Sequence, residues 1–271
     1  LSAYLWGWPM IVLLLGTHIF LSVRLRFPQR KLFTAIRLSV QRDKSQKGDV
    51  SQFGALATAL AATIGTGNII GVATAVALGG PGAVFWCWLT GVFGISTKYS
   101  EALLAIKYRV KSEKGHMLGG PMYTLERGLG WRKMGILFAV FTAIAAFGIG
   151  CTVQANAIST IMHASYGIST SVSGAVLMLL AAAVILGGVR SISKVCSMLV
   201  PFMALLYVLG CIYILCMNVI YVVPALKLIV NSAFSPEAAG GGLAGGSVIM
   251  AARYGIARGL FSNESGLGSA P

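Results

Sequence analysis

A run of 48 residues without a charged side chain, from Val50 to Thr97, most constrains what this chain can fold into. It is too long for one membrane-spanning helix, which needs about 20 apolar residues, but it suits two such helices. The stretch Gly79-Gly80-Pro81-Gly82 predicts the turn between them. A second glycine-rich stretch, Gly65-Thr66-Gly67-Asn68, falls near the middle of the first span. Backbone freed from helical hydrogen bonding at membrane depth is tolerated only inside protein or beside a water-filled cavity, so we expect a broken helix there.

The composition predicts an all-α integral membrane protein. Only 28 of the 271 residues are charged, 21 basic and 7 acidic, whereas about a quarter is usual in soluble domains. The mean hydropathy is +0.81 and 56% of the residues are hydrophobic. The 34 glycines fit close helix packing and helix breaks in a membrane. A soluble globular protein is therefore excluded.

The net charge of +14 sets topology and does not indicate a nucleic-acid partner. Seventeen of the 21 basic residues lie in alternate loops: eight within 24–47, seven within 107–133, and two at Arg190 and Lys194. Cytoplasmic loops of membrane proteins carry such an excess, which places the amino terminus outside. Some of this charge can also contact anionic lipid headgroups in the bilayer.

Seven membrane spans are expected. The first leads into a strongly basic loop, as a stop-transfer helix does, and it lacks the basic start of a signal peptide. The loop 218–245 carries only Lys227 and Glu237 and is expected outside. The chain stops within a segment that reads as part of a span, so we expect an amino-terminal fragment of a longer protein. The predicted spans are Leu5–Val23, Phe53–Leu78, Ala83–Ile106, Gly135–Met162, Ser171–Leu186, Val195–Met217 and one that begins near Gly246.

The break at 65–68 is the first candidate site. The half-helix after the break presents backbone N–H groups and a positive dipole end, which suit the carboxylate of an amino acid held by Thr66, Gly67 and Asn68. The half-helix before it leaves carbonyls that suit Na⁺ around Ala62 and Gly65, with the Asn68 side-chain oxygen as one more ligand. Close packing is the alternative, because Gly67 and Gly71 have a small-xxx-small spacing.

Polar side chains within two further spans are candidates as well. Gln154 and Asn156 are carboxamides in one span, where each needs a partner. Being two residues apart on a helix, they point to different faces, and we assign Gln154 to the substrate. The alternative for Asn156 is a bond to a neighbouring helix.

Asn263, Glu264, Ser265 and Gly266 open the last segment. A glutamate at membrane depth is a functional candidate, here for gating or coupling, whereas an outside loop or an ion pair with Arg258 is the alternative. Lys98 and Glu101 are three residues apart, and we expect only a structural salt bridge between them.

Other function classes lack a signal. The three histidines are scattered without ligand spacing, and none of the five cysteines forms a CxxC pair, so no transition-metal site is predicted. No nucleophile–base pair stands out, and neither an enzyme nor a cofactor is expected.

Three stretches carry a resemblance to the alanine/glycine:cation symporters, also called the sodium:alanine symporter family. Residues 79–94 (GGPGAVFWCWLTGVFG) look like the family signature, with Cys87 where methionine is usual. Residues 65–72 (GTGNIIGV) look like its first broken-helix motif, and 258–271 (RGLFSNESGLGSAP) are similar to its second, with Ser265 where alanine is commoner. Residues 153–156 (VQAN) also fit, although Cys151 replaces a usual asparagine.

The resemblance implies a LeuT-like fold of two inverted five-helix repeats, preceded by an extra helix at 1–23. Residues 51–217 would form the first repeat and 246–271 the start of the second. The implied function is import of alanine or glycine coupled to Na⁺, by alternating access across the cell membrane. Gln154 would contact the substrate, and residues 263–268 would close the site from the second repeat. The alternatives are a proton-coupled transporter with Glu264 as the titrating group, a channel lined by the polar stretch, an intramembrane enzyme, and an inactive fragment.

Overall fold

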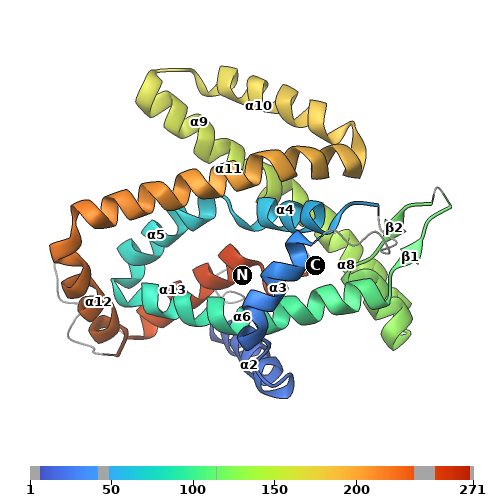
Figure 1. The fold of residues 1–271 in the computed structure, drawn as a ribbon, viewed down its shortest axis with the longest axis horizontal. Coiled ribbons are helices and arrows are strands. Elements are labelled where there is room, and N and C mark those ends of the chain that lie inside the picture. Colours follow the sequence, from blue (N-terminus) through green and yellow to red (C-terminus); the bar gives the residue numbers. More distant parts are fainter. Residues whose placement is uncertain (1–6, 42–48, 114, 235–247, 269–271) are drawn as a thin grey trace. The chain divides into compact units, whose positions relative to one another are not determined.

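The computed structural model describes residues 7–41, 49–113, 115–234 and 248–268, and these are predominantly helical (Figure 1). Strands occur in the described residues only as a short hairpin, β1 (Val110–Lys111) paired antiparallel with β2 (Met117–Leu118). The all-α prediction therefore holds apart from this hairpin. The α-helices are α2 (Trp8–Arg24), α3 (Leu32–Val40), α4 (Gln52–Thr63), α5 (Ile70–Gly79), α6 (Gly82–Lys107), α7 (Pro121–Tyr123), α8 (Arg132–Ala145), α9 (Val153–Tyr166), α10 (Thr170–Ile185), α11 (Gly188–Met217), α12 (Val219–Phe234) and α13 (Val248–Asn263).

Short 3₁₀ and π segments adjoin these helices: η1 (Pro28–Lys31), η2 (Thr66–Asn68), η3 (Thr124–Gly128) and η4 (Ala146–Thr152). By length and apolar composition, two helical stretches of the described chain can cross a membrane, Arg132–Tyr166 and Gly188–Met217, or up to four if each bent helix pair counts as one span. One such bent pair is α4 with the segment Thr66–Gly79. Helix α6 is 26 residues long but lies outside that set.

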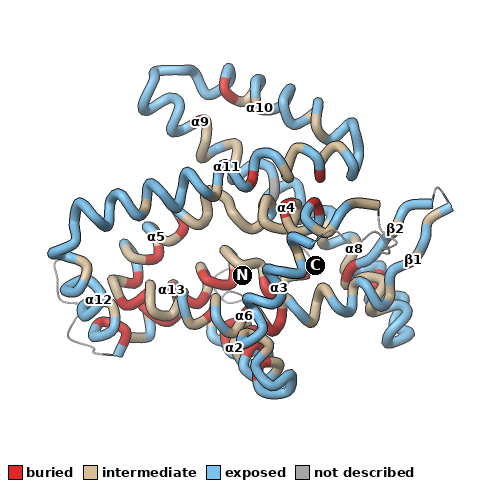
Figure 2. The backbone as a smooth tube through the Cα atoms, in the orientation of Figure 1, coloured by how far each residue is buried: buried red, intermediate tan, exposed pale blue. Residues whose placement is uncertain are grey.

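The chain divides into two compact units. The first unit comprises Leu1–Ile36, Thr63–Glu101 and Phe202–Ala270, and the second comprises Arg37–Ala62 and Ala102–Pro201. Helix α13 contacts α2 and α5 of the first unit, and much of it is buried, as its red stretches in Figure 2 show. Helix α13 is thus the centre of the first unit.

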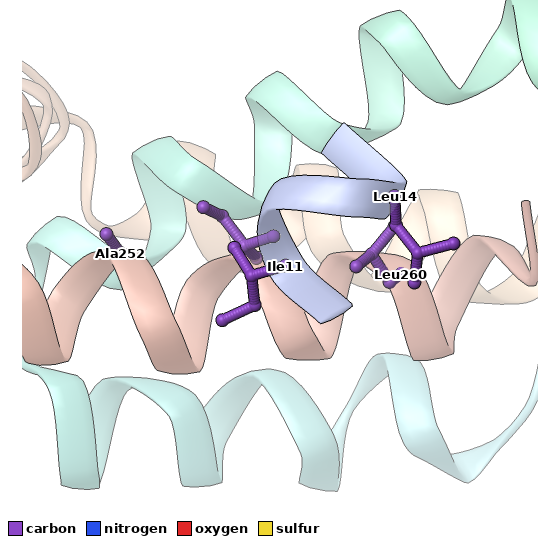
Figure 3. Packing of buried hydrophobic residues seen from close by; sticks show 5 residues of the cluster. Ile11, Leu14, Ala252 and Leu260 are labelled. Atoms are coloured by element: carbon purple, nitrogen blue, oxygen red, sulfur yellow. The ribbon is translucent and has the colours of Figure 1, made fainter. Parts of the chain in front are cut away.

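An apolar cluster joins α2 to α13. Figure 3 shows Ile11 and Leu14 of α2 directed onto α13, where they meet Ala252 and Leu260. Ile11 and Leu260 are 2% and 0% exposed, so this contact is fully closed to solvent. Burying an aliphatic side chain of this size contributes about 1.5–3 kcal/mol in water.

Two glycines let α13 approach α6 closely. A Cβ added at Gly255 would lie 2.7 Å from the Trp86 Cβ, and one at Gly259 would lie 2.9 Å from the Thr90 Cβ. Real Cβ atoms do not sit so close, so only glycine allows this packing. Gly255 and Gly259 form the GxxxG spacing that is typical of close helix pairs in membranes.

In the second unit, the loop before α4 is tied to the hairpin. The backbone N–H of Met117 donates to Asp49 Oδ2 at 2.8 Å, and His116 Nδ1 lies 3.7 Å from the same oxygen. Gly54 of α4 lies against Ser193 at the start of α11, where a Cβ would collide with the Ser193 hydroxyl.

Several predicted boundaries are confirmed and two expected loops are wrong. Helix α10 matches the predicted span within one residue at each end, and the turn after Gly79 is present, with Gly80 at φ +74°. Residues 219–234 were expected in a loop, but they form α12, and 32–40 form α3 within the expected basic loop. Helix α12 has 16 residues, as α10 has, but it contains Pro224 and Lys227, which favour a loop in the sequence. The end of the predicted loop 218–245, with Glu237, and the predicted start at Gly246 lie outside the described residues.

Candidate functional site

The first predicted break is confirmed. Helix α4 ends at Thr63, Gly65 has an extended backbone, the single turn η2 covers Thr66–Asn68, and α5 begins at Ile70. After proline, glycine is the residue that destabilises a helix most. Two glycines on either side of a threonine are enough to interrupt the helix here. The residue at the N-cap of α5, Ile69, makes no side-chain capping hydrogen bond. A helix start of this kind attracts anionic groups.

Asn68 holds the break together. Its side-chain Nδ2 donates to the Thr63 carbonyl at 2.8 Å, and its backbone N–H donates to the Gly65 carbonyl at 3.0 Å. Its Oδ1 accepts a hydrogen bond from the Ser262 hydroxyl of α13. Asn68 therefore satisfies a carbonyl at the end of α4 and links it to α13. An ion bound at Oδ1 would share that oxygen with Ser262.

Helix α13 ends where a second broken helix is predicted, and we call the turn after it, residues 264–268, the second interruption. The helix ends at Asn263, and left-handed backbone follows at Glu264 (φ +50°), Gly266 (φ +85°) and Gly268 (φ +68°). Asn263 Oδ1 accepts from the Ser265 N–H at 3.1 Å, and its Nδ2 donates to the Thr90 carbonyl of α6 at 3.4 Å. Ser265 is 2% exposed and the other three residues of the predicted set, Asn263, Glu264 and Gly266, are less buried.

The two interruptions lie side by side in the first unit. Helix α5 runs antiparallel to α13, because Gly67 faces Phe261, Gly71 faces Arg258, and Gly79 faces Ala251. A Cβ at Gly67 would lie 3.5 Å from Phe261 Cε1, an ordinary contact. Gly67 and Gly71 both face α13, but a Cβ at either would make only ordinary contacts, so packing against α13 does not by itself require glycine there.

Glu101 makes more contacts than the sequence predicted. The expected salt bridge is present, with Lys98 Nζ 3.8 Å from Glu101 Oε2. In addition, Glu101 Oε1 accepts from the backbone N–H groups of Gly266 and Gly268, each at 3.1 Å. Its partners lie 165 and 167 residues away in the chain, so helical spacing gives no sign of them.

The remaining candidates lie in the second unit. Ala62 is exposed near the end of α4, Gln154 is half-buried in the first turn of α9, and Asn156 is exposed. A π-helical segment, η4, ends two residues before Gln154. Such segments are frequent at functional sites, and nothing in the sequence analysis indicated this one. The contact of Gln154 with the substrate stays a prediction. The described residues hold no cluster of three metal-ligating side chains.

Comparison with known proteins gives a match along the full chain. The model of the sodium:alanine symporter family matches residues 1–271. The sodium/alanine symporter AgcS of Methanococcus maripaludis is 52% identical over 277 residues, covering 100% of this chain and 60% of that protein. An uncharacterized transporter of Haemophilus influenzae is 52% identical over 273 residues, again 100% of this chain and 60% of the relative. A putative sodium/proton-dependent alanine carrier protein, YrbD of Bacillus subtilis, is 42% identical over 271 residues, 100% of this chain and 55% of the relative.

The chain therefore spans 55–60% of the length of these transporters. Its membrane-length apolar helices and its two helix interruptions agree with that match. The family match covers every residue that carries the candidate site. The chain belongs to the sodium:alanine symporter family.

Proposed function

We propose that this chain is part of a longer transporter that imports alanine or glycine together with Na⁺ by alternating access across the cell membrane. The observation that carries the proposal is the direct link between the two helix interruptions, in which Ser262 donates to Asn68. Discontinuous helices that meet in this way are where secondary transporters bind substrate and ion. The names of two relatives, a sodium/alanine symporter and a sodium/proton-dependent alanine carrier, support alanine and Na⁺.

In this proposal the substrate carboxylate lies at the start of α5, held by Thr66, Gly67 and Asn68. The helix start at Ile70 supports an anion there, since Ile69 at the N-cap makes no side-chain capping hydrogen bond. Na⁺ lies at the carbonyl end of α4, near Ala62 and Gly65, with the Asn68 oxygen as a further ligand. Hard oxygen ligands of this kind suit an alkali cation.

The second interruption closes the site in this proposal. Asn263, Ser265 and Gly266 face the substrate from the second repeat, and Glu264 takes part in gating. Gln154 reaches the substrate from α9, and Asn156 bonds a neighbouring helix or the substrate. We also propose the LeuT-like arrangement, with 1–23 as an extra helix, 51–217 as the first repeat and 246–271 as the start of the second. A Na⁺ moving inward would gain about 2.3 kcal/mol per 100 mV of membrane potential.

Proton coupling is the second candidate. One relative is named a sodium/proton-dependent carrier, which favours testing H⁺ as the driving ion as well. Glu264 is the carboxylate that we assign to the proton in that case, since it lies in the left-handed turn directly after α13.

Uptake of radiolabelled alanine tests both Na⁺ coupling and proton coupling. The full-length transporter is reconstituted in proteoliposomes, and either a Na⁺ gradient or a pH gradient is imposed, with K⁺ in place of Na⁺ as the control. Saturable accumulation that requires Na⁺ supports the symporter. Accumulation that follows the pH gradient and ignores Na⁺ supports the proton-coupled form. Non-saturable, uncoupled flux in folded protein contradicts both and favours a channel.

A further inference from the structure

The turn after α13 forms a backbone site for an anion, and the chain fills it with its own carboxylate. Left-handed residues alternate along this turn at Glu264, Gly266 and Gly268. Such alternation directs successive N–H groups to one side and produces a concave anion-binding site. The N–H groups of Gly266 and Gly268 converge on one oxygen, Glu101 Oε1, at 3.1 Å each.

The side chain of Glu101 is well placed and mostly buried. Its exposed fraction is 16%, and it comes from α6, a helix that packs along α13 through Gly255 and Gly259. The other oxygen, Oε2, makes no hydrogen bond within the described residues and lies 3.8 Å from Lys98 Nζ. Hydrogen bonds to an ionised carboxylate are about twice as strong as neutral ones. The turn is therefore held to α6 chiefly through Oε1.

Helix α2 covers the same turn from another side. A Cβ at Gly266 would lie 3.0 Å from Leu14 Cδ2 and 3.6 Å from His18 Cε1. His18 is fully buried, and its Nδ1 is 2.7 Å from the hydroxyl of Thr97 on α6. The wall that α2 and α6 form around the turn is thus itself fixed by a buried hydrogen bond.

We propose that Glu101 is a positioning residue for transport: it holds the turn 264–268 in the conformation that closes the substrate site, without contacting the substrate. This inference rests on the proposed function, in which residues 263–266 close the site. It gives Glu101 a role beyond its salt bridge with Lys98.

The role has a specific kinetic signature. If only a fraction of molecules has the turn closed, the apparent affinity for substrate falls by that same fraction. Saturating alanine then restores the closed turn, so the maximal rate is preserved. Loss of Glu101 should therefore raise KM and leave Vmax nearly unchanged. A general folding defect would instead lower Vmax at an unchanged KM.

The experiment compares three variants of the full-length transporter: Glu101→Ala, Glu101→Gln and, as a matched control, Glu126→Gln. Glu126 is a carboxylate of the second unit with a 43% exposed side chain, 3.7 Å from Arg132. Hydrogen exchange measured by mass spectrometry follows the peptide that contains 264–268, and proteoliposome uptake gives KM and Vmax for alanine.

We expect Glu101→Ala to speed exchange of this peptide about tenfold, equal to about 1.4 kcal/mol, and to raise KM by the same factor with Vmax within about twofold. Glu101→Gln keeps an oxygen that can accept both N–H groups, so its exchange and KM should lie between wild type and Glu101→Ala. Glu126→Gln should match wild type in both readouts.

Unchanged exchange in Glu101→Ala overturns the positioning role even if KM rises. A fall in Vmax at constant KM overturns it as well. A wild-type protein that accumulates no alanine under a Na⁺ gradient overturns the proposed function, and with it the transport role of Glu101, whatever the exchange shows. The two failures are thus distinguishable.

Discussion

The close contact between α6 and α13 predicts a large cost for a single methyl group at Gly259. A Cβ there would collide with the Thr90 hydroxyl and lie 2.9 Å from the Thr90 Cβ and 3.2 Å from the Cys87 carbonyl oxygen. The Thr90 hydroxyl donates to that same carbonyl at 2.7 Å, so it cannot rotate away without losing its hydrogen bond. Two backbone-anchored neighbours must therefore move, and the helices must separate.

The magnitude follows from three terms. Overpacking of this kind costs about 1–3 kcal/mol. The Thr90 hydrogen bond contributes about 1 kcal/mol more if it breaks. Replacing glycine by alanine within a helix stabilises the folded protein by about 1 kcal/mol, because alanine has the higher helix propensity. We therefore expect Gly259→Ala to destabilise the protein by about 1–3 kcal/mol, the sum of these terms.

Equilibrium unfolding of the full-length transporter in mixed detergent micelles, titrated with SDS, measures this change. Gly91→Ala is the matched control on α6, because a Cβ at Gly91 meets nothing within 4 Å. This control should be neutral or stabilising by up to about 1 kcal/mol. If Gly259→Ala is as stable as wild type, or if Gly91→Ala costs as much, the close packing of α6 on α13 is not what requires glycine.

Three further predictions concern single side chains. Asn68→Ala removes the link between the two interruptions and should raise the alanine KM in uptake assays at least about tenfold, the loss of about 1.4 kcal/mol of hydrogen bonding. An unchanged KM would exclude Asn68 from the site. Gln154→Ala should weaken equilibrium binding of alanine by about tenfold, and unaltered binding would show that Gln154 does not contact the substrate. Ser22→Ala leaves the buried Ser96 hydroxyl, 2.8 Å away, without this partner. It should lower stability by about 1–3 kcal/mol in the same SDS titration, whereas no change would contradict a stabilising role for that bond.

Much of the first interruption could be predicted from the sequence, because it depends on local chemistry. Gly65 and Gly67 weaken the helix wherever they occur, and the break lies between Thr63 and Ile70. The Lys98–Glu101 pair was also predicted and is confirmed, since residues three apart share a helix face. The family could be recognised from three motifs, and the match along the whole chain confirms it.

The parts that the sequence did not indicate depend on partners far away in the chain. Helix α12 is apolar but contains Pro224 and Lys227, so it was not predicted as a span, and it packs through Phe234 against Phe85 at 5.0 Å between ring centroids. Aromatic side chains near a membrane surface are equally typical of an interfacial belt. The sequence therefore could not distinguish such a belt from packing between two helices. The π-helical turn before Gln154 likewise has no composition that distinguishes it from α-helix.

The sequence by itself determined the class of protein, the break in the first span and the residues that make it, because hydropathy, glycine content and helical spacing act over a few neighbouring residues. Only the tertiary structure decided that Asn68 meets Ser262, that Gly255 and Gly259 bring α13 onto α6, and that Glu101 binds the turn after α13. Each of these contacts joins segments more than 150 residues apart, and such a pairing leaves no periodic trace in a single sequence. It is fixed by which helix faces fit closely enough to exclude lipid and water.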